Sequence, residues 1–181
     1  SSARRHRHAR RLITKTRELC NGADTTPDDD IHDRLNRTVL ELATSLARQD
    51  EARLDVISVW DVPEEQALRN GRIHLPEGEI LSILARERDR SASRLDELLK
   101  AFPSDAPRTR GLHVRGRPAQ ALVTHARAER IDTIVMGTVA RTGLPGFLMG
   151  NTAETVLARV ACSVLAVKPE GFVSPVEPGD P

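Results

Sequence analysis

The sequence predicts an α/β protein in which helices cover both faces of a mainly parallel β-sheet. From Leu54 onward, short apolar runs alternate with longer amphipathic runs in the order strand, helix, strand, helix, strand, loop, helix, strand. The apolar runs lack a strict alternation of apolar and polar residues, which is typical of parallel strands that are buried on both sides.

Length and composition limit the function classes that this chain can serve. With 181 residues it is long enough for one domain with a real core and some additional chain. Aromatic residues make up only 2%, so the core is expected to be aliphatic, and platforms for stacking single-stranded nucleic acid are scarce. The formal net charge of +1 gives no overall basic field, so a nucleic-acid partner is not expected.

Cysteine usage and hydropathy predict a cytoplasmic protein without a metal site. Cys20 and Cys162 are the only cysteines, and they form neither a C-x-x-C pair nor another metal-ligand spacing. No apolar run reaches the roughly 18 residues of a membrane span. The basic N-terminus is not followed by the apolar segment of a signal peptide.

Composition divides the chain into an arm, a domain and a tail. Residues 1–17 contain seven Lys or Arg residues and are expected to form a solvated, flexible arm, or alternatively a tail that attracts anionic partners. Residues 18–170 are expected to form the domain. Residues 171–181 are acidic and contain Pro175, Pro178 and Pro181, which indicates an extended tail.

Two long helices and the first clear strand are predicted from apolar spacing. Residues 31–47 read as a helix because Ile31, Leu35, Val39, Leu42 and Leu46 recur every three or four positions and would form one buried stripe. A strand over 54–62 and a loop over 63–76 follow. The next helix, 77–102, is charged on all sides over 86–91, so part of it is expected to project beyond the core.

Shorter elements complete the prediction. Pro118 begins a helix, since proline is favoured in the first helical turn, and a further helix starts at Asn151. The remaining strands are expected at residues 111–115, 133–136 and 163–167.

A glycine-rich loop joins the strand at 133–136 to the helix that starts at Asn151. Its glycines are Gly137, Gly143, Gly146 and Gly150, and glycine permits positive φ and close approach of the backbone. The loop leads to a helix N-terminus, where unpaired N–H groups and the helix dipole favour an anion. Ligands of parallel sheets also bind beyond the carboxyl ends of strands. The loop is therefore interpreted as a phosphate-binding loop, the alternative being a connection whose glycines serve only as turns.

Three segments resemble the universal stress protein family, and in particular the second domain of its tandem E-type members. They are Ile134–Thr138 (IVMGT), Gly150–Glu154 (GNTAE) and Ser163–Pro169 (SVLAVKP). The resemblance covers roughly residues 31–176. It implies a three-layer α/β sandwich with a five-stranded parallel sheet, and a homodimer formed through the last strand, Ser163 to Val167. It also suggests that the chain is half of a tandem protein.

The resemblance further implies a site for ATP or AMP. In the ATP-binding branch of the family, the motif is Gly, two residues, Gly, nine residues, Gly, then Ser or Thr. Gly137 and Gly150 fill the first and third glycine positions, whereas Ala140 and Asn151 replace the second glycine and the hydroxyl residue. Asn151 could donate to a phosphate or could only cap its helix, and Arg141 could pair with a phosphate or be solvated. The implied nucleotide-binding residues are Asp24, Gly137, Thr138, Ala140, Arg141, Gly150, Asn151 and Thr152.

The first strand of the family should end in an Asp that contacts the adenosine part of the nucleotide. Residues 17–24 contain no continuous β-branched run, so this strand is either poorly formed or displaced towards Arg11 to Thr16. Asp24 is the best counterpart of the family's Asp, and Asp28 to Asp30 are rivals.

Two functions from different classes follow. The first is a nucleotide-responsive or other small-ligand binding module of the stress response, and the second is a structural module that acts through dimerisation. Catalysis is not expected, because His113 and His125 have no Ser or Asp partner visible in the sequence and a weak ATPase would need a water-activating base. Trp60 could stack on a base or simply pack in the core.

Overall fold

The fold is a parallel sheet between two layers of helices. The computed structural model describes residues 11–16, 27–70, 75–101, 108–138 and 150–169. The strands form one sheet in the order β3-β2-β1-β4-β5, and every neighbouring pair is parallel. They are β1 (Arg11–Thr16), β2 (Arg53–Trp60), β3 (Thr109–Arg115), β4 (Thr133–Gly137) and β5 (Ser163–Val167). The predicted α/β class is confirmed.

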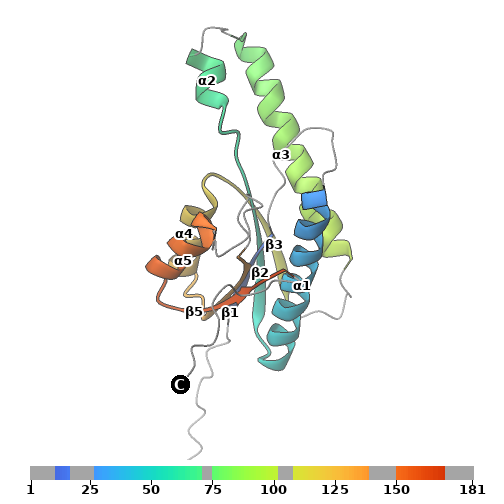
Figure 1. Ribbon diagram of the computed structural model, residues 1–181, viewed down its shortest axis with the longest axis vertical. Helices are drawn as coiled ribbons and strands as arrows, with labels where there is room; N and C mark the ends of the chain where they lie inside the picture. The colour runs from blue at the N-terminus through green and yellow to red at the C-terminus, as the bar shows by residue number, and fades with distance from the viewer. Residues whose placement is uncertain (1–10, 17–26, 71–74, 102–107, 139–149, 170–181) are drawn as a thin grey trace, which may run out of the picture.

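The helices divide between the two faces of the sheet, as Figure 1 shows. On one face lie α1 (Pro27–Gln49) and α3 (Glu77–Lys100), and on the other lie α4 (Pro118–Ala128) and α5 (Asn151–Arg159). A short helix, α2 (Glu65–Asn70), occurs within the segment that the sequence assigned to a loop.

The expectation of a flexible basic arm over residues 1–17 is wrong for residues 11–16. Residues 11–16 form β1, which pairs with β2 on one side and β4 on the other, so they belong to the centre of the domain. The second of the two alternatives for the first strand, displacement towards Arg11 to Thr16, is therefore the one observed. The basic residues Arg11 and Lys15 within the run Arg-Leu-Ile-Thr-Lys-Thr concealed the strand, although Ile13 is fully buried. Residues 1–10, and the tail over 171–181, lie outside the described residues.

The buried face of α1 differs in detail from the predicted stripe. Val39, Ala43 and Ala47, spaced four apart, are buried against Leu54 and Val56 of β2. Leu42 is 39% exposed, because the packing surface is centred on these alanines, whose small side chains let α1 approach the sheet closely.

The first half of α3 projects beyond the sheet together with α2, as the charged segment 86–91 predicted (Figure 1). This projection has a small apolar cluster of its own, formed by buried Val62, Ile80 and Leu84. Arg69 of α2 forms ion pairs with Glu65 and with Glu77, which ties the two helices together at their exposed end.

A buried carboxylate joins β2, β3 and α4 on the opposite face. The Asp55 side chain is 1% exposed, and Arg110 donates to both of its oxygens, at 3.2 and 2.9 Å. His125 Nε2 of α4 lies 2.8 Å from Asp55 Oδ2, and Arg53 Nε lies 3.4 Å from Oδ1. Burial alone would raise the pKa of Asp55, but the hydrogen bonds from Arg110 and His125 outweigh it and hold this pKa below its usual value.

We expect the substitution Asp55→Asn to lower the free energy of unfolding by about 2–4 kcal/mol, because it leaves Arg110 and His125 without their charged partner. Since the folded-state pKa of Asp55 lies below the usual value of 3.8, its stabilisation is present above that pH and is lost as pH falls through the folded-state pKa. Urea unfolding at several pH values measures both effects. Glu41→Gln, on the exposed face of α1, should change stability little; an equal loss for both variants would contradict the assignment.

Close packing explains the glycine at the end of β4. A Cβ atom at Gly137 would stand 2.7 Å from Leu35 Cδ2 and 3.1 Å from Leu35 Cγ. Leu35 is 7% exposed and belongs to the core between α1 and the sheet. The first glycine of the loop is therefore required for helix–sheet packing.

We expect Gly137→Ala to destabilise the fold by about 1–3 kcal/mol, because the added methyl group displaces a buried leucine. In the double variant with Leu35→Ala, the methyl group gains space, so the combined loss should be smaller than the sum of the two single losses. Thermal unfolding of the parent protein, the two single variants and the double variant measures the coupling between positions 137 and 35. Strict additivity would contradict the contact.

Candidate functional site

The strand order reverses the direction of winding at the carboxyl edge of the sheet between β1 and β4, which is where open parallel sheets form their ligand crevice. The chain leaves β1 through α1 on one face and leaves β4 towards α5 on the other, so the direction of winding reverses between these two strands. In open parallel sheets, ligands bind at this reversal. Both α1 and α5 begin on this side of the sheet, since each follows the carboxyl end of its strand.

The base of the glycine-rich loop is closed by backbone hydrogen bonds. Gly150 donates its N–H to the carbonyl of Thr138 at 3.2 Å, which joins the two ends of the segment 139–149. Thr138 is buried, and both its N–H (3.0 Å) and its hydroxyl (3.3 Å) donate to the carbonyl of Val167 at the end of β5. The loop is thus anchored to the last strand as well as to β4.

The N-terminus of α5 follows this closed base directly. Gly150 is the N-cap residue, with φ −64° and ψ 145°, and no side chain of the described residues caps the helix. Its carbonyl accepts the N–H groups of Ala153 and Glu154. The N–H groups of Asn151 and Thr152 have no acceptor within the helix and are oriented along the dipole that favours an anion.

The interpretation of Asn151 as a helix cap is wrong. Asn151 is the first residue of α5, one position beyond the N-cap, and its side chain is exposed. Because the chain is already helical there, the amide cannot reach back to the N–H groups of the first turn as an N-cap side chain does. The backbone carbonyl of Asn151 accepts a hydrogen bond from the hydroxyl of Thr155 at 2.7 Å.

The structure brings together five of the eight predicted nucleotide-binding residues. They lie where β4 ends and α5 begins, and they are Gly137, Thr138, Gly150, Asn151 and Thr152. Ala140, Arg141 and Asp24 lie outside the described residues. The last residue of β1 is Thr16, so the strand does not itself end in the expected Asp. The rivals Asp28 to Asp30 lie at the start of α1.

Trp60 lies at the carboxyl end of β2, but it is covered by protein. It is 8% exposed, and its ring stacks on that of His113 with centroids 5.8 Å apart and planes 12° from parallel. The Arg115 guanidinium lies 5.3 Å from the Trp60 ring centroid and also pairs with Glu65 of α2. These contacts support the packing interpretation, because they leave little of the indole for stacking on a base.

A serine–histidine pair that the sequence did not reveal lies beneath α3. Ser91 Oγ of α3 is 2.6 Å from His113 Nε2 of β3, and Ser58 Oγ of β2 is 3.5 Å from Ser91 Oγ. Both serines are buried. The pKa of His113 is lowered mainly by burial and also by the positive charge of Arg88, which keeps the imidazole neutral at pH 7. A substrate could not reach this hydroxyl without moving α3, so the cluster is a hydrogen-bonded part of the core. No sequence motif links residues on different elements in this way.

The described residues also bear on metal binding and on membrane insertion. In this part of the chain, no group of three His, Cys, Asp or Glu side chains is placed to hold a metal ion. Across the same ranges, no helix is long and apolar enough to pass through a membrane.

Comparisons with known proteins agree with the geometry. A model of the universal stress protein family matches residues 30–168. The chain is 27% identical over 165 residues to a universal stress protein E homolog of Haemophilus influenzae, covering 90% of this chain and 49% of the relative. It therefore spans about half the length of that curated relative.

Two further matches extend the comparison. Universal stress protein MJ0531 of Methanocaldococcus jannaschii is 33% identical over 129 residues, covering 70% of this chain and 71% of the relative. The crystal structure of a putative universal stress protein from Pseudomonas aeruginosa superposes with a TM-score of 0.60 at 25% identity, covering 89% of this chain and 48% of that one. On these matches, and on a fold whose glycine loop joins β4 to α5 at the reversal of strand order, the chain belongs to the universal stress protein family.

Proposed function

We propose that this chain is a cytoplasmic stress-response module that binds an adenine nucleotide, ATP or AMP, at the crevice between β1 and β4. The observation that carries this proposal is the N-terminus of α5, which no described side chain caps and which follows a loop base closed by the Gly150–Thr138 hydrogen bond. Such a terminus at a reversal of strand order is a favourable place for phosphate.

The described residues suggest how the phosphates would be held. The N–H groups of Asn151 and Thr152 would donate to phosphate oxygens, and the half-buried Thr152 hydroxyl and the exposed Asn151 amide could add further bonds. The hydroxyl of Thr138 already donates to Val167, so its part would be to fix the loop base.

The hydrogen bonds of Thr138 connect the proposed ligand site to the exposed edge of the sheet at β5. Thr138 joins the base of the loop to the last residue of β5 through two hydrogen bonds. A nucleotide bound at this loop base would therefore act on the β5 edge and on whatever binds there. The proposed role is that of a ligand-responsive binding protein and not an enzyme, since a weak ATPase would need a base beside the phosphates.

We expect Asn151→Asp to weaken nucleotide binding by about tenfold or more while leaving the fold intact. The new carboxylate would repel phosphate, whereas a negative charge in the first turn of a helix is favourable to the helix by about 0.3–1 kcal/mol. Equilibrium dialysis with ATP and with AMP measures the affinity, and thermal unfolding measures stability.

Asn70→Asp is the matched control, because it adds the same charge at an exposed position of α2, away from the crevice. It should bind nucleotide as the parent protein does. Failure of the parent protein to bind either nucleotide at millimolar concentration would refute the proposal, as would equal binding by the Asn151 variant.

The second candidate is a structural module that acts through dimerisation, and the exposed β5 edge favours it. Among the described strands, β5 has a neighbour on one side only, and Leu165 on this strand is 38% exposed. An apolar edge strand is a template for pairing with another chain. In a longer protein of the length of its relatives, a second domain could occupy the same edge.

We expect Leu165→Lys to convert a dimer of this chain into a folded monomer, because a charge on an edge strand opposes pairing. Val114→Lys is the matched control, since Val114 is 37% exposed on β3, the strand at the other end of the sheet. Sedimentation equilibrium distinguishes the two variants. A monomeric parent protein, or a dimeric Leu165 variant, would contradict pairing through β5.

A further inference from the structure

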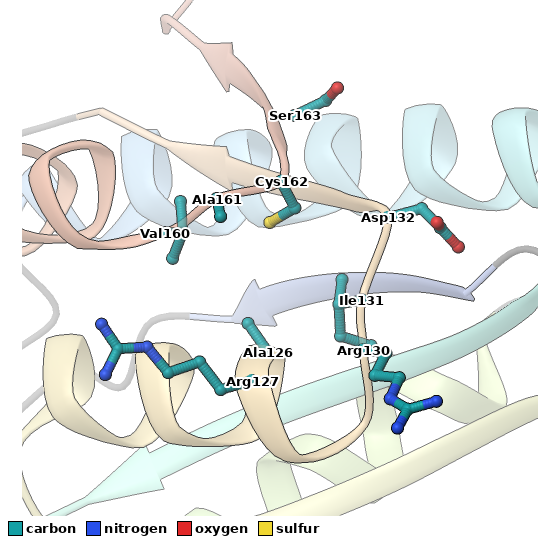
Figure 2. Close-up of a pocket in the computed structure, with 9 residues that line it drawn as sticks. All are labelled: Ala126, Arg127, Arg130, Ile131, Asp132, Val160, Ala161, Cys162 and Ser163. Atoms are coloured by element: carbon teal, nitrogen blue, oxygen red, sulfur yellow. The ribbon is translucent and has the colours of Figure 1, made fainter.

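A pocket lies at the opposite edge of the sheet from the proposed nucleotide site. It has a volume of about 400 Å³ and is formed where α4 ends, where β4 begins, and at the turn from α5 into β5. Figure 2 shows the turn Val160–Ser163 on one side of it and the end of α4 on the other. Its size lies in the range of roughly 300–1,000 Å³ that is usual for small-molecule sites.

The lining of this pocket combines an apolar floor with charged ends. Ala126, Ile131 and Cys162 form much of the floor, and Figure 2 shows the Cys162 sulfur directed towards α4. Burial raises the pKa of the Cys162 thiol, which therefore remains neutral at pH 7 and behaves as part of the apolar surface. Arg127 and Arg130 stand on either side of the floor in Figure 2.

The charge of the lining favours an anion. Two arginines outnumber the single carboxylate of Asp132, and Ser163 adds a hydroxyl. Arg127 is held in place because its Nη2 donates to the carbonyl of Arg159 at the end of α5, at 3.1 Å, which leaves further guanidinium donors for a ligand. The pocket thus offers positive charge beside an apolar surface.

Arg130 occupies a backbone position that glycine would satisfy at lower cost. Its φ is 51°, and it follows α4 as the left-handed residue of a Schellman motif, with Ile131 N–H donating to Ala126 (2.9 Å) and Arg130 N–H to Arg127 (3.4 Å). Glu51 stands in the same motif after α1, with φ 51° and the corresponding bonds from Ala52 to Ala47 and from Glu51 to Arg48. The chain therefore contains a matched pair of positions, of which Arg130 lines the pocket.

We propose that this pocket binds a small organic anion, a carboxylate with a short apolar body, whose charge is taken by Arg130, with Arg127 adding positive charge on the other side, and whose body lies on Ala126, Ile131 and Cys162. The site is separate from the proposed nucleotide crevice, because β4 and α5 each extend from one to the other. For a ligand of about six non-hydrogen atoms, the dissociation constant falls in the millimolar range.

Butyrate is the probe, and the single thiol of the pocket reports its binding. In the Cys20→Ser protein, Cys162 is the only cysteine, so its alkylation by uncharged iodoacetamide can be followed alone. Butyrate should slow this reaction with a millimolar midpoint, and its methyl NMR signal should broaden in the presence of the protein. Butylamine, butanol and sodium chloride at equal ionic strength should have little effect.

Two glycine variants separate binding from folding. Arg130→Gly relieves the left-handed backbone and should unfold at the same temperature or higher, yet raise the midpoint for butyrate by about tenfold or more. Glu51→Gly gives the same backbone relief without changing the pocket, so its midpoint should equal that of the parent. The proposal is overturned if butyrate neither slows the alkylation of Cys162 nor shows a broadened methyl NMR signal. It is also overturned if butylamine or butanol slows the alkylation as much as butyrate does, or if the Arg130 variant has the same midpoint for butyrate as the parent protein.

Discussion

The pairing of β1 with both β2 and β4 is the constraint on which the rest of the structure depends. Without this six-residue strand, the sheet would separate into the pairs β2–β3 and β4–β5. Its central position also creates the reversal of winding between β1 and β4, where the nucleotide site is proposed. The same short ladder therefore holds the two halves of the fold together and sets the place at which open parallel sheets bind their ligands.

The two edges of the sheet are built differently, and the difference follows from parallel strands. At the carboxyl edge, loops lead into helix N-termini, so backbone N–H groups and the positive ends of helix dipoles collect there. At the amino edge, helices end and their carbonyls collect, and arginines such as Arg127 pair with them. Positive charge at one edge comes from the backbone, and at the other from side chains.

Much of the fold could be predicted, because it depends on local patterns. Apolar runs located β2 to β5, and the projection of α3 followed from its charged centre. The misses were α2 and the exposure of Leu42, and the position of β1 was left between two alternatives; each depends on packing between elements. β1 carries polar residues along its length and gains its stability from two neighbours, which a single segment does not reveal. Of the candidate site, the spacing of Gly137 and Gly150 was visible, whereas Asp24, Ala140 and Arg141 lie outside the described residues.

What the sequence by itself determined was the family, the α/β class and the loop that joins β4 to α5, because glycine spacing and apolar periodicity are properties of a single segment. Only the tertiary structure decided the roles of particular residues. Gly137 makes room for Leu35, Thr138 fastens the loop to β5, and Asn151 begins its helix without capping it. The partners of Asp55 and Ser91, and the arginines beside Cys162, come from separate elements, and only the folded chain brings them within reach of one another.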